Sequence, residues 1–207
     1  MMIRAKPCAA LFVAAALAGC AALEPARPVL PRAPAFDLVG RVAVTHDGRP
    51  FSSGVRWQHA AERDEIWLLT PLGQALAHIV DGAEGAVFTG SDRRQYRARD
   101  VEALTRRTLG WELPVARLTW WVRGDIATDG VITEVARDPQ GRLLRLQQDG
   151  WDITYVYRSQ DSADSLPRRL DLKSESQSIR LVIDTWRQDF VGPDPTKSLF
   201  APPIDLE

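Results

Sequence analysis

Cysteine, histidine and methionine are scarce in this chain. Among 207 residues there are two cysteines, three histidines and two methionines. Cys8 lies in an N-terminal segment that we expect to be removed, so the mature chain would keep one cysteine and no internal disulfide bond. The few candidate ligands have no metal-ligand spacing, and we therefore predict no metal site.

An excess of charge of one sign and a nucleophile motif are also missing. The 26 basic and 27 acidic residues nearly balance, which gives no field that would favour nucleic acid. Neither Ser52-Ser53-Gly54 nor the region from Ser162 to Ser165 forms a nucleophile elbow. His46 in a turn and His59 at a strand end are expected in solvent, and His78 is expected to be a satisfied sheet residue. The sequence predicts neither an enzyme nor a cofactor.

The N-terminus contains a secretory signal. Arg4 and Lys6 precede an apolar run over residues 9–16, which is too short to span a membrane as a mature helix. The run ends in Leu17-Ala18-Gly19-Cys20, which resembles the bacterial lipobox. We therefore predict a signal peptide over residues 1–19 and a covalent lipid on Cys20. A plain secretory signal with an incidental cysteine is the weaker alternative.

The predicted lipid implies permanent residence at a membrane, because two or more acyl chains hold a protein firmly in the bilayer. Ala21 follows Cys20. In bacterial lipoproteins an aspartate at that position commonly favours retention in the inner membrane. By this resemblance the chain is expected at the periplasmic leaflet of the outer membrane.

Proline marks both ends of the mature chain. Residues 20–35 contain Pro25, Pro28, Pro31 and Pro34 at a period of three, which favours an extended polyproline-like tether. Residues 192–207 form a Pro-rich tail that is expected to be poorly ordered. A single domain over residues 36–191 is predicted between them.

Short alternating or doubly apolar runs, separated by turn signals, predict an antiparallel meander. Two helices interrupt it, over Val101–Leu109 and Val115–Val122, with Asp100 as N-cap and Gly110 as C-cap of the first. About eleven strands are too many for a flat sheet of this length. The predicted fold is mainly β with a helical lid (α+β), an incomplete and strongly curved antiparallel β-barrel enclosing an apolar cavity. The expected strands cover residues 36–45, 51–59, 66–70, 74–80, 86–89, 95–98, 131–137, 142–148, 151–158, 168–173 and 178–187.

The apolar run from Ile66 to Val80 has a turn at its centre. Pro71 presets the backbone for the first corner of the turn, and Gly73 tolerates the left-handed conformation that follows. Leu72 is then left at the tip. A leucine gains about 1.5 to 3 kcal/mol on leaving water, which favours contact with a membrane over an exposed position. The alternative is that Leu72 folds back into the core.

Several stretches occur in the order typical of one family. Besides Cys20, they are Leu38-Val39-Gly40-Arg41, Val55-Arg56-Trp57-Gln58, Leu69-Thr70-Pro71-Leu72-Gly73, Arg94-Gln95-Tyr96, Asp171-Leu172, and Ile179-Arg180-Leu181 with Trp186. With these motifs the chain resembles the LolB family of outer-membrane lipoproteins. The resemblance covers essentially the whole mature domain, and the turn at Leu72 is its most specific part.

The resemblance implies an incomplete barrel of about eleven strands, capped by helices, whose cavity binds acyl chains of cargo lipoproteins. Cargo would come from a periplasmic, LolA-like carrier and leave for outer-membrane lipid, without covalent chemistry. The family's protruding leucine corresponds to Leu72, flanked by Pro71 and Gly73. The family also has a helix before the first strand, which the prolines of residues 21–35 would resist. The chain is expected to be a monomer.

Cavity-lining residues can be assigned only from strand alternation and helix periodicity. The candidates are Trp57, Leu68, Trp121, Trp151 and Ile183. Tryptophans more often belong to an ordinary core, and that interpretation also stands for Trp57, and for Trp120 and Trp186. Gly40 and Gly54 lie within strands, where they indicate a bend or a close approach.

Two other functions remain open. The chain could be a structural or assembly lipoprotein of the outer membrane that binds a protein partner through its sheet edge or the Leu72 turn. A lipid-active enzyme would require a nucleophile constellation, which the sequence does not show.

Overall fold

The computed structural model describes residues 33–61, 63–158 and 165–188, all within the compact unit Pro31–Glu207. The signal peptide, Cys20, most of the tether and the Pro-rich tail lie outside the described residues. The same holds for residues 21–32, where the family pattern has a helix.

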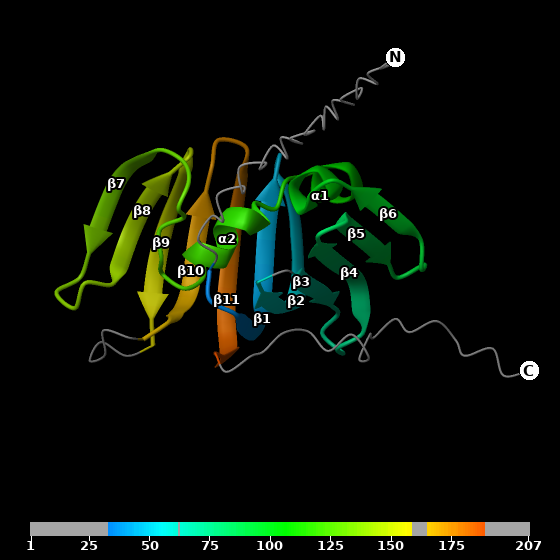
Figure 1. Cartoon of the computed structure of the whole chain (residues 1–207), viewed down its shortest axis with the longest axis horizontal. Coiled ribbons are helices and arrows are strands. Elements are labelled where there is room, and N and C mark those ends of the chain that lie inside the picture. Colours follow the sequence, from blue (N-terminus) through cyan, green and yellow to red (C-terminus); the bar gives the residue numbers. More distant parts are fainter. Residues whose placement is uncertain (1–32, 62, 159–164, 189–207) are drawn as a thin grey trace, which may run out of the picture. The chain divides into compact units, whose positions relative to one another are not determined.

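Eleven antiparallel strands form one sheet in the order β6-β5-β4-β3-β2-β1-β11-β10-β9-β8-β7 (Figure 1). The mainly β fold predicted from the sequence is confirmed. Because β1 pairs with β11 at the middle of the sheet, strands from the two ends of the domain meet there. The strands are β1 (Phe36–His46), β2 (Arg49–Ala60), β3 (Arg63–Leu69), β4 (Ala75–Gly82), β5 (Gly85–Gly90), β6 (Gln95–Ala98), β7 (Ile132–Arg137), β8 (Leu143–Gln148), β9 (Trp151–Tyr157), β10 (Pro167–Lys173) and β11 (Gln177–Arg187).

The two edge strands, β6 and β7, are consecutive strands in the chain, and the segment between them contains both helices. These are α1 (Val101–Leu109) and α2 (Val115–Trp121). The chain therefore crosses the sheet from one edge to the other, and the helices cover one face, here called the inner face (Figure 1). Within the described ranges, neither helix has the length and apolar character needed to cross a bilayer.

Capping explains where α1 begins and ends. The side chain of Asp100 accepts a hydrogen bond of 2.7 Å from the main-chain N–H of Ala103, and Gly110 adopts a left-handed conformation with φ of 83°. Both caps were predicted, and α1 has the predicted bounds. The second helix ends at Trp121, one residue earlier than predicted, because Val122 is its C-cap.

Gly40 permits a close approach between β1 and β11. A Cβ atom at this position would lie 2.1 Å from the main-chain oxygen of Val182, and the strand register shifts between Val39 and Gly40. At Gly54 an added Cβ would lie 3.3 Å from Cβ of Leu69. The close approaches expected at these two glycines are confirmed, and Gly40 is much the tighter of the two.

The core lies between the inner face and the helices. Trp57 is buried there, whereas Trp186 is only partly buried against it. The expectation that Trp120 belongs to the core is wrong, since this side chain is half-buried and outside the core cluster. Successive helical residues are rotated by about 100°, and Trp121 takes the inward position with no exposed surface.

The expectation that His59 is solvated is also wrong. Its side chain is buried, with Nδ1 2.9 Å from Oδ1 of Asp64 and Nε2 3.2 Å from the main-chain oxygen of Ala33. The segment that leads into β1 supplies this second contact, which strand alternation alone does not reveal. His46 is half-buried at the end of β1 rather than free in a turn. His78 is a sheet residue with polar and aromatic contacts, to Glu65 and Trp67, as expected.

Candidate functional site

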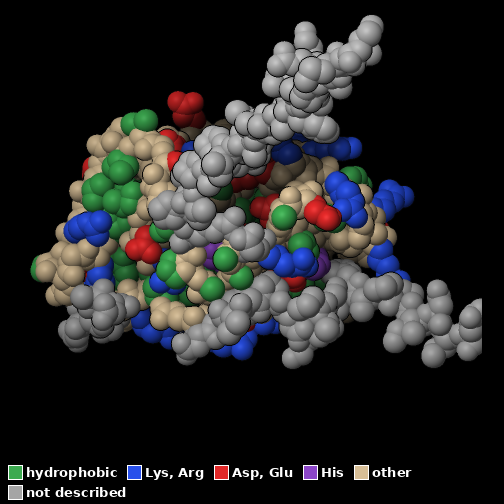
Figure 2. All heavy atoms as spheres, in the orientation of Figure 1, with side chains coloured by type: hydrophobic (Ala, Val, Ile, Leu, Met, Phe, Trp, Pro, Cys, Tyr) green, Lys and Arg blue, Asp and Glu red, His purple; other side chains and the backbone are tan. Residues whose placement is uncertain are grey.

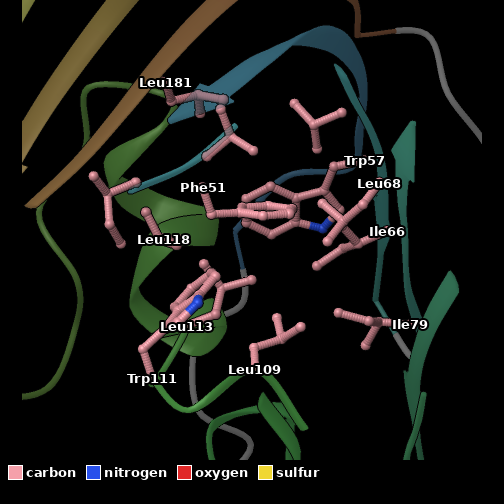
Figure 3. A pocket seen from close by; sticks show the side chains of 13 residues that line it. Phe51, Trp57, Ile66, Leu68, Ile79, Leu109, Trp111, Leu113, Leu118 and Leu181 are labelled. Atoms are coloured by element: carbon pink, nitrogen blue, oxygen red, sulfur yellow. The ribbon is translucent and has the colours of Figure 1, made fainter. Parts of the chain in front are cut away.

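An apolar cavity of about 40 Å³ lies between the inner face of the sheet and the helical segment (Figure 3). Strands β1, β2, β3, β4 and β11 form one wall. The other wall comes from α1, α2 and the loop between them, and we call the whole segment Val101–Trp121 the lid. Every lining side chain is apolar: Val42, Phe51, Val55, Trp57, Ile66, Leu68, Ile79, Leu109, Trp111, Leu113, Leu118, Ile179 and Leu181.

Alternation in β2 and β3 places large side chains on this wall. Val55 and Trp57 are two residues apart and share the inner face, and Trp57 pairs with Ile66 of β3 in the antiparallel register. The indole Nε1 of Trp57 donates a 2.6 Å hydrogen bond to Oδ1 of Asp64. Its polar edge is therefore satisfied outside the cavity lining, and the ring contributes apolar surface.

The middle of the lid is attached mainly by apolar contacts. Leu109 is the last residue of α1, Trp111 and Leu113 lie in the interhelical loop, and all three line the cavity. Within the lid, the main-chain N–H of Leu113 donates 3.0 Å to Oγ1 of Thr105, which is wholly buried. Between lid and sheet, Nε2 of Gln177 donates 2.9 Å to the main-chain oxygen of Glu112. The loop in the middle of the lid is thus held to the sheet by one direct hydrogen bond and by apolar contacts, whereas α2 also carries an ion pair of 2.6 Å between Arg117 and Asp149.

The C-terminal end of the lid is fixed by a buried glutamine. Gln148 has no exposed surface, and its Oε1 accepts hydrogen bonds from Nε1 of Trp121 at 2.9 Å and from the N–H of Ala127 at 3.2 Å. Its Nε2 donates to the main-chain oxygens of Ala127 and Asp129. Such a fully satisfied buried amide holds this end of the lid firmly to β8.

The open space between the two walls is small, about 40 Å³. An acyl chain occupies many times this volume. Its entry would require the lid to move outward, and the apolar surface exposed at each wall would then be covered again by the acyl chain. A long apolar ligand would therefore need the two walls to move apart.

The hairpin between β3 and β4 presents Leu72 to solvent. The N–H of Thr70 donates 2.8 Å to the oxygen of Gln74, and the N–H of Gly73 donates 2.9 Å to the oxygen of Thr70. Gly73 adopts the predicted left-handed conformation, with φ of 79°. Leu72 is 87% exposed, the largest exposed fraction of any large apolar side chain in the described part of the chain. It does not fold back into the core.

The five cavity candidates separate into two groups. Trp57 and Leu68 line the cavity, whereas Trp121, Trp151 and Ile183 lie outside its lining. Trp121 packs 6.2 Å from Trp151, measured between ring centroids, at the end of the lid held by Gln148. Ile183 is buried on β11, where Ile179 and Leu181 line the cavity instead. Alternation identifies the face of a strand, but not which stretch of it lies under the middle of the lid.

Sequence reasoning missed the contributions of Phe51, Trp111 and Leu113. The signal for the last two was present, because Gly110 ends one helix and Pro114 precedes the next. Large apolar side chains in a loop this short are expected to point toward the core and not toward solvent. Phe51, by contrast, lies close to the first residue of its strand, where exposure would be the usual expectation.

On the opposite, outer face a buried aspartate is paired with two arginines. Asp37 is 2% exposed, and its oxygens accept hydrogen bonds from Arg56, Gln58 and Arg187. Burial raises the pKa of Asp37, but the hydrogen bonds from Arg56 and Gln58 and the charges of the two arginines outweigh it and hold the pKa below the ordinary value. This network joins β1, β2 and β11 and has a structural role.

A second acidic group lies beside the start of the lid. Burial, followed by the charges of Asp64, Glu102 and Asp100, raises the pKa of Asp81 to about 6. Asp64 and Asp81 occupy paired positions on β3 and β4, so their negative charges repel one another. Across the described ranges, no group of three or more acidic, histidine or cysteine residues is arranged to hold a metal ion.

Known proteins with a similar sequence belong to one family. The family described as "Outer membrane lipoprotein LolB" matches residues 34–186. The "Outer-membrane lipoprotein LolB" of Thiobacillus denitrificans is 42% identical over 178 residues, which cover 83% of this chain and 92% of that protein. The protein of the same name from Nitrosomonas europaea is 39% identical over 163 residues, covering 78% and 76%. A solved LolA superfamily protein from Nitrosomonas europaea is 10% identical, covers 75% of this chain and 86% of its own, and has a TM-score of 0.43.

Proposed function

Because the chain belongs to the LolB family of outer-membrane lipoproteins, we propose that it accepts acylated lipoproteins from a LolA-like periplasmic carrier and inserts them into the outer membrane. Membership of the family supports a role in lipoprotein localisation. The observation that carries the finer proposal is the cavity beneath the lid, whose thirteen lining side chains are all apolar.

In this proposal the acyl chains of the cargo enter between the lid and the inner face of the sheet. Because the acyl chain would come from the carrier and not from water, transfer would require its contacts with the sheet and the lid to be at least as favourable as those in the carrier. The hydrogen bond from Gln177 to Glu112 is the polar contact that would have to break near the cavity. Trp57 and Leu68 would contact the acyl chain from the sheet, and Trp111 and Leu113 from the lid.

Delivery would use the anchor and the exposed turn together. A lipid on Cys20 would hold the domain at the periplasmic leaflet of the outer membrane. Pro71 and Gly73 shape a turn that exposes Leu72, and we assign to this turn the first contact with outer-membrane lipid. The process would require no cofactor and no covalent step, and the chain would act as a monomer.

Transfer of cargo from carrier to this chain tests the proposal. The carrier is loaded with an acylated lipoprotein, incubated with the mature chain, and the cargo that moves is measured by co-purification. We expect transfer of the acylated cargo and none of the same cargo without acyl chains. Absence of transfer to a folded chain would overturn the proposal. Equal transfer of unacylated cargo would favour a protein-binding role through the sheet edge or the Leu72 turn.

A further inference from the structure

One hairpin turn has an arginine where two turns of the same form have glycine. Three hairpins have five-residue turns with the same main-chain hydrogen bonds. In each turn the N–H of the first residue donates to the carbonyl oxygen of the fifth, and the N–H of the fourth residue donates to the carbonyl oxygen of the first. The fourth residue has a left-handed backbone conformation in all three turns. It is Gly73 (φ of 79°), Gly141 (84°) or Arg93 (62°). This conformation suits glycine and is unfavourable for a long L side chain.

Local structure gives no reason for arginine at this position. The other non-glycine residues with positive φ in the described ranges are two aspartates, which tolerate this conformation comparatively well. Backbone strain that persists at a surface turn points to a function of the side chain. Arg93 is exposed, and among the described residues no acidic side chain forms an ion pair with it. Its neighbour Asp92 is instead engaged by Arg94.

The turn that contains Arg93 lies beside the turn that contains Leu72. Strand β4 pairs with β5, with Ala77 opposite Gly90, so the β3–β4 and β5–β6 turns leave the same end of adjacent hairpins. Neighbouring strands are about 4.8 Å apart, which places the two hairpins about 10 Å apart. Figure 2 shows Lys and Arg side chains gathered on the side where Figure 1 places β5 and β6.

An exposed leucine beside an unpaired arginine is the combination that binds an anionic bilayer surface. The apolar side chain enters the boundary between headgroups and acyl chains, and the guanidinium binds phosphate oxygens. We propose that Arg93 contacts the phosphates of anionic phospholipid and orients the hairpin so that Leu72 enters the bilayer. The inference rests on the proposed function only in assigning Leu72 to the membrane.

Vesicle binding without cargo tests this inference independently of lipoprotein transfer. The mature chain, residues 20–207, carries Cys20→Ala so that no acyl anchor dominates the binding. It is sedimented with vesicles of phosphatidylcholine, with or without phosphatidylglycerol. We expect tighter binding to the anionic vesicles, and Arg93→Gly should weaken it about fivefold, as expected for one arginine near an anionic surface. Salt should remove this difference.

Two further variants separate charge from backbone strain. Arg93→Lys keeps the charge and should retain most of the binding, whereas Arg93→Gly should unfold at the same or a higher temperature because it relieves the left-handed strain. Arg168→Gln removes one exposed charge from β10 and should leave binding unchanged. The inference is overturned if Arg93→Gly binds anionic vesicles as tightly as the parent chain, or if Arg168→Gln weakens binding equally. If Arg93→Gly binds vesicles like the parent chain but receives or delivers cargo more slowly, the lipid contact is refuted and an acidic protein partner for Arg93 is favoured.

The two proposals fail separately. A chain that transfers cargo, but whose vesicle binding does not depend on Arg93, refutes the inference alone. A chain whose Arg93→Gly variant loses vesicle binding, but which accepts no cargo, refutes the proposed function alone.

Discussion

Gln177, at the start of β11, donates a hydrogen bond of 2.9 Å from Nε2 to the main-chain oxygen of Glu112 in the middle of the lid. The two residues are 65 positions apart, and the bond connects the sheet to the loop that carries Trp111 and Leu113. The rest of the cavity boundary is apolar. This bond is therefore the local polar contact that opposes opening of the lid.

Replacing Gln177 should loosen the lid. In Gln177→Leu the main-chain oxygen of Glu112 loses its partner, at a cost of about 1 to 2 kcal/mol. Amide hydrogen exchange over residues 109–113 should accelerate, whereas exchange in β1 should change little. Gln147→Leu is the control, because Gln147 accepts a side-chain hydrogen bond from Thr133 and does not contact the lid. Unchanged exchange over residues 109–113 would show that Gln177 does not hold the lid.

Leu72→Glu should leave the fold intact, because the side chain is 87% exposed. We expect a change in the free energy of unfolding within about 0.5 kcal/mol. Acceptance of cargo from the carrier should persist, but insertion of the cargo into liposomes should fall several-fold. Moving the carboxylate of the new side chain into the acyl region of a bilayer costs free energy. Val131→Glu, at a second exposed apolar residue (68%), is the matched control. Equal delivery by Leu72→Glu and the parent chain would refute the role assigned to Leu72.

Gly40→Ala and Gly54→Ala should differ in their effect on stability. The added methyl group at position 40 would meet the main-chain oxygen of Val182, which cannot move without disturbing the β1–β11 pairing. We expect a loss of more than about 2 kcal/mol. At position 54 the nearest atom is Cβ of Leu69, at 3.3 Å, and a loss of about 1 kcal/mol or less is expected. Urea denaturation measures both, and equal losses would contradict the account of the central strand pair.

Asp81 should make stability depend on pH. Its folded pKa of about 6 lies above the ordinary value of 3.8, so between these values the folded chain binds more protons than the unfolded chain. The contribution of Asp81 to stability is therefore present below about pH 4 and is lost as pH rises through 6. Asp81→Asn should raise the free energy of unfolding at pH 7.5 by ~1 to 3 kcal/mol.

The same Asp81→Asn substitution should give no comparable gain at pH 4, where the parent carboxyl group is already protonated. Thermal unfolding at the two pH values measures the difference. An equal gain at both would show that the effect comes from something other than the charge of Asp81.

The sequence predicted the strands and helices well because their signals are local. Alternating apolar residues, turn residues such as Gly73 and the caps Asp100 and Gly110 act within a few positions, and the structure confirms them. The curved sheet also followed, since about eleven strands in a domain of this size cannot lie flat.

The residues that line the cavity could be predicted only in part from the sequence, because the lining depends on contacts between distant segments. Alternation placed Ile183 on the correct face, but the position of the lid along β11 decides that Leu181 lines the cavity and Ile183 does not. The burial of His59 likewise depends on Ala33, 26 residues away. The arginine in the strained turn could not be recognised from sequence, because the left-handed conformation of Arg93 becomes visible only in the backbone.

The position of the cargo's acyl chains in the complex tests most directly whether they are bound beneath the lid. A cargo lipoprotein with a photoreactive group near the end of an acyl chain is transferred to the mature chain and irradiated, and the linked peptides are identified by mass spectrometry. We expect links to cavity-lining residues on both walls, such as Phe51 and Leu68 of the sheet and Leu113 of the lid. Links confined to the Leu72 turn or to the outer face around Asp37 would contradict it.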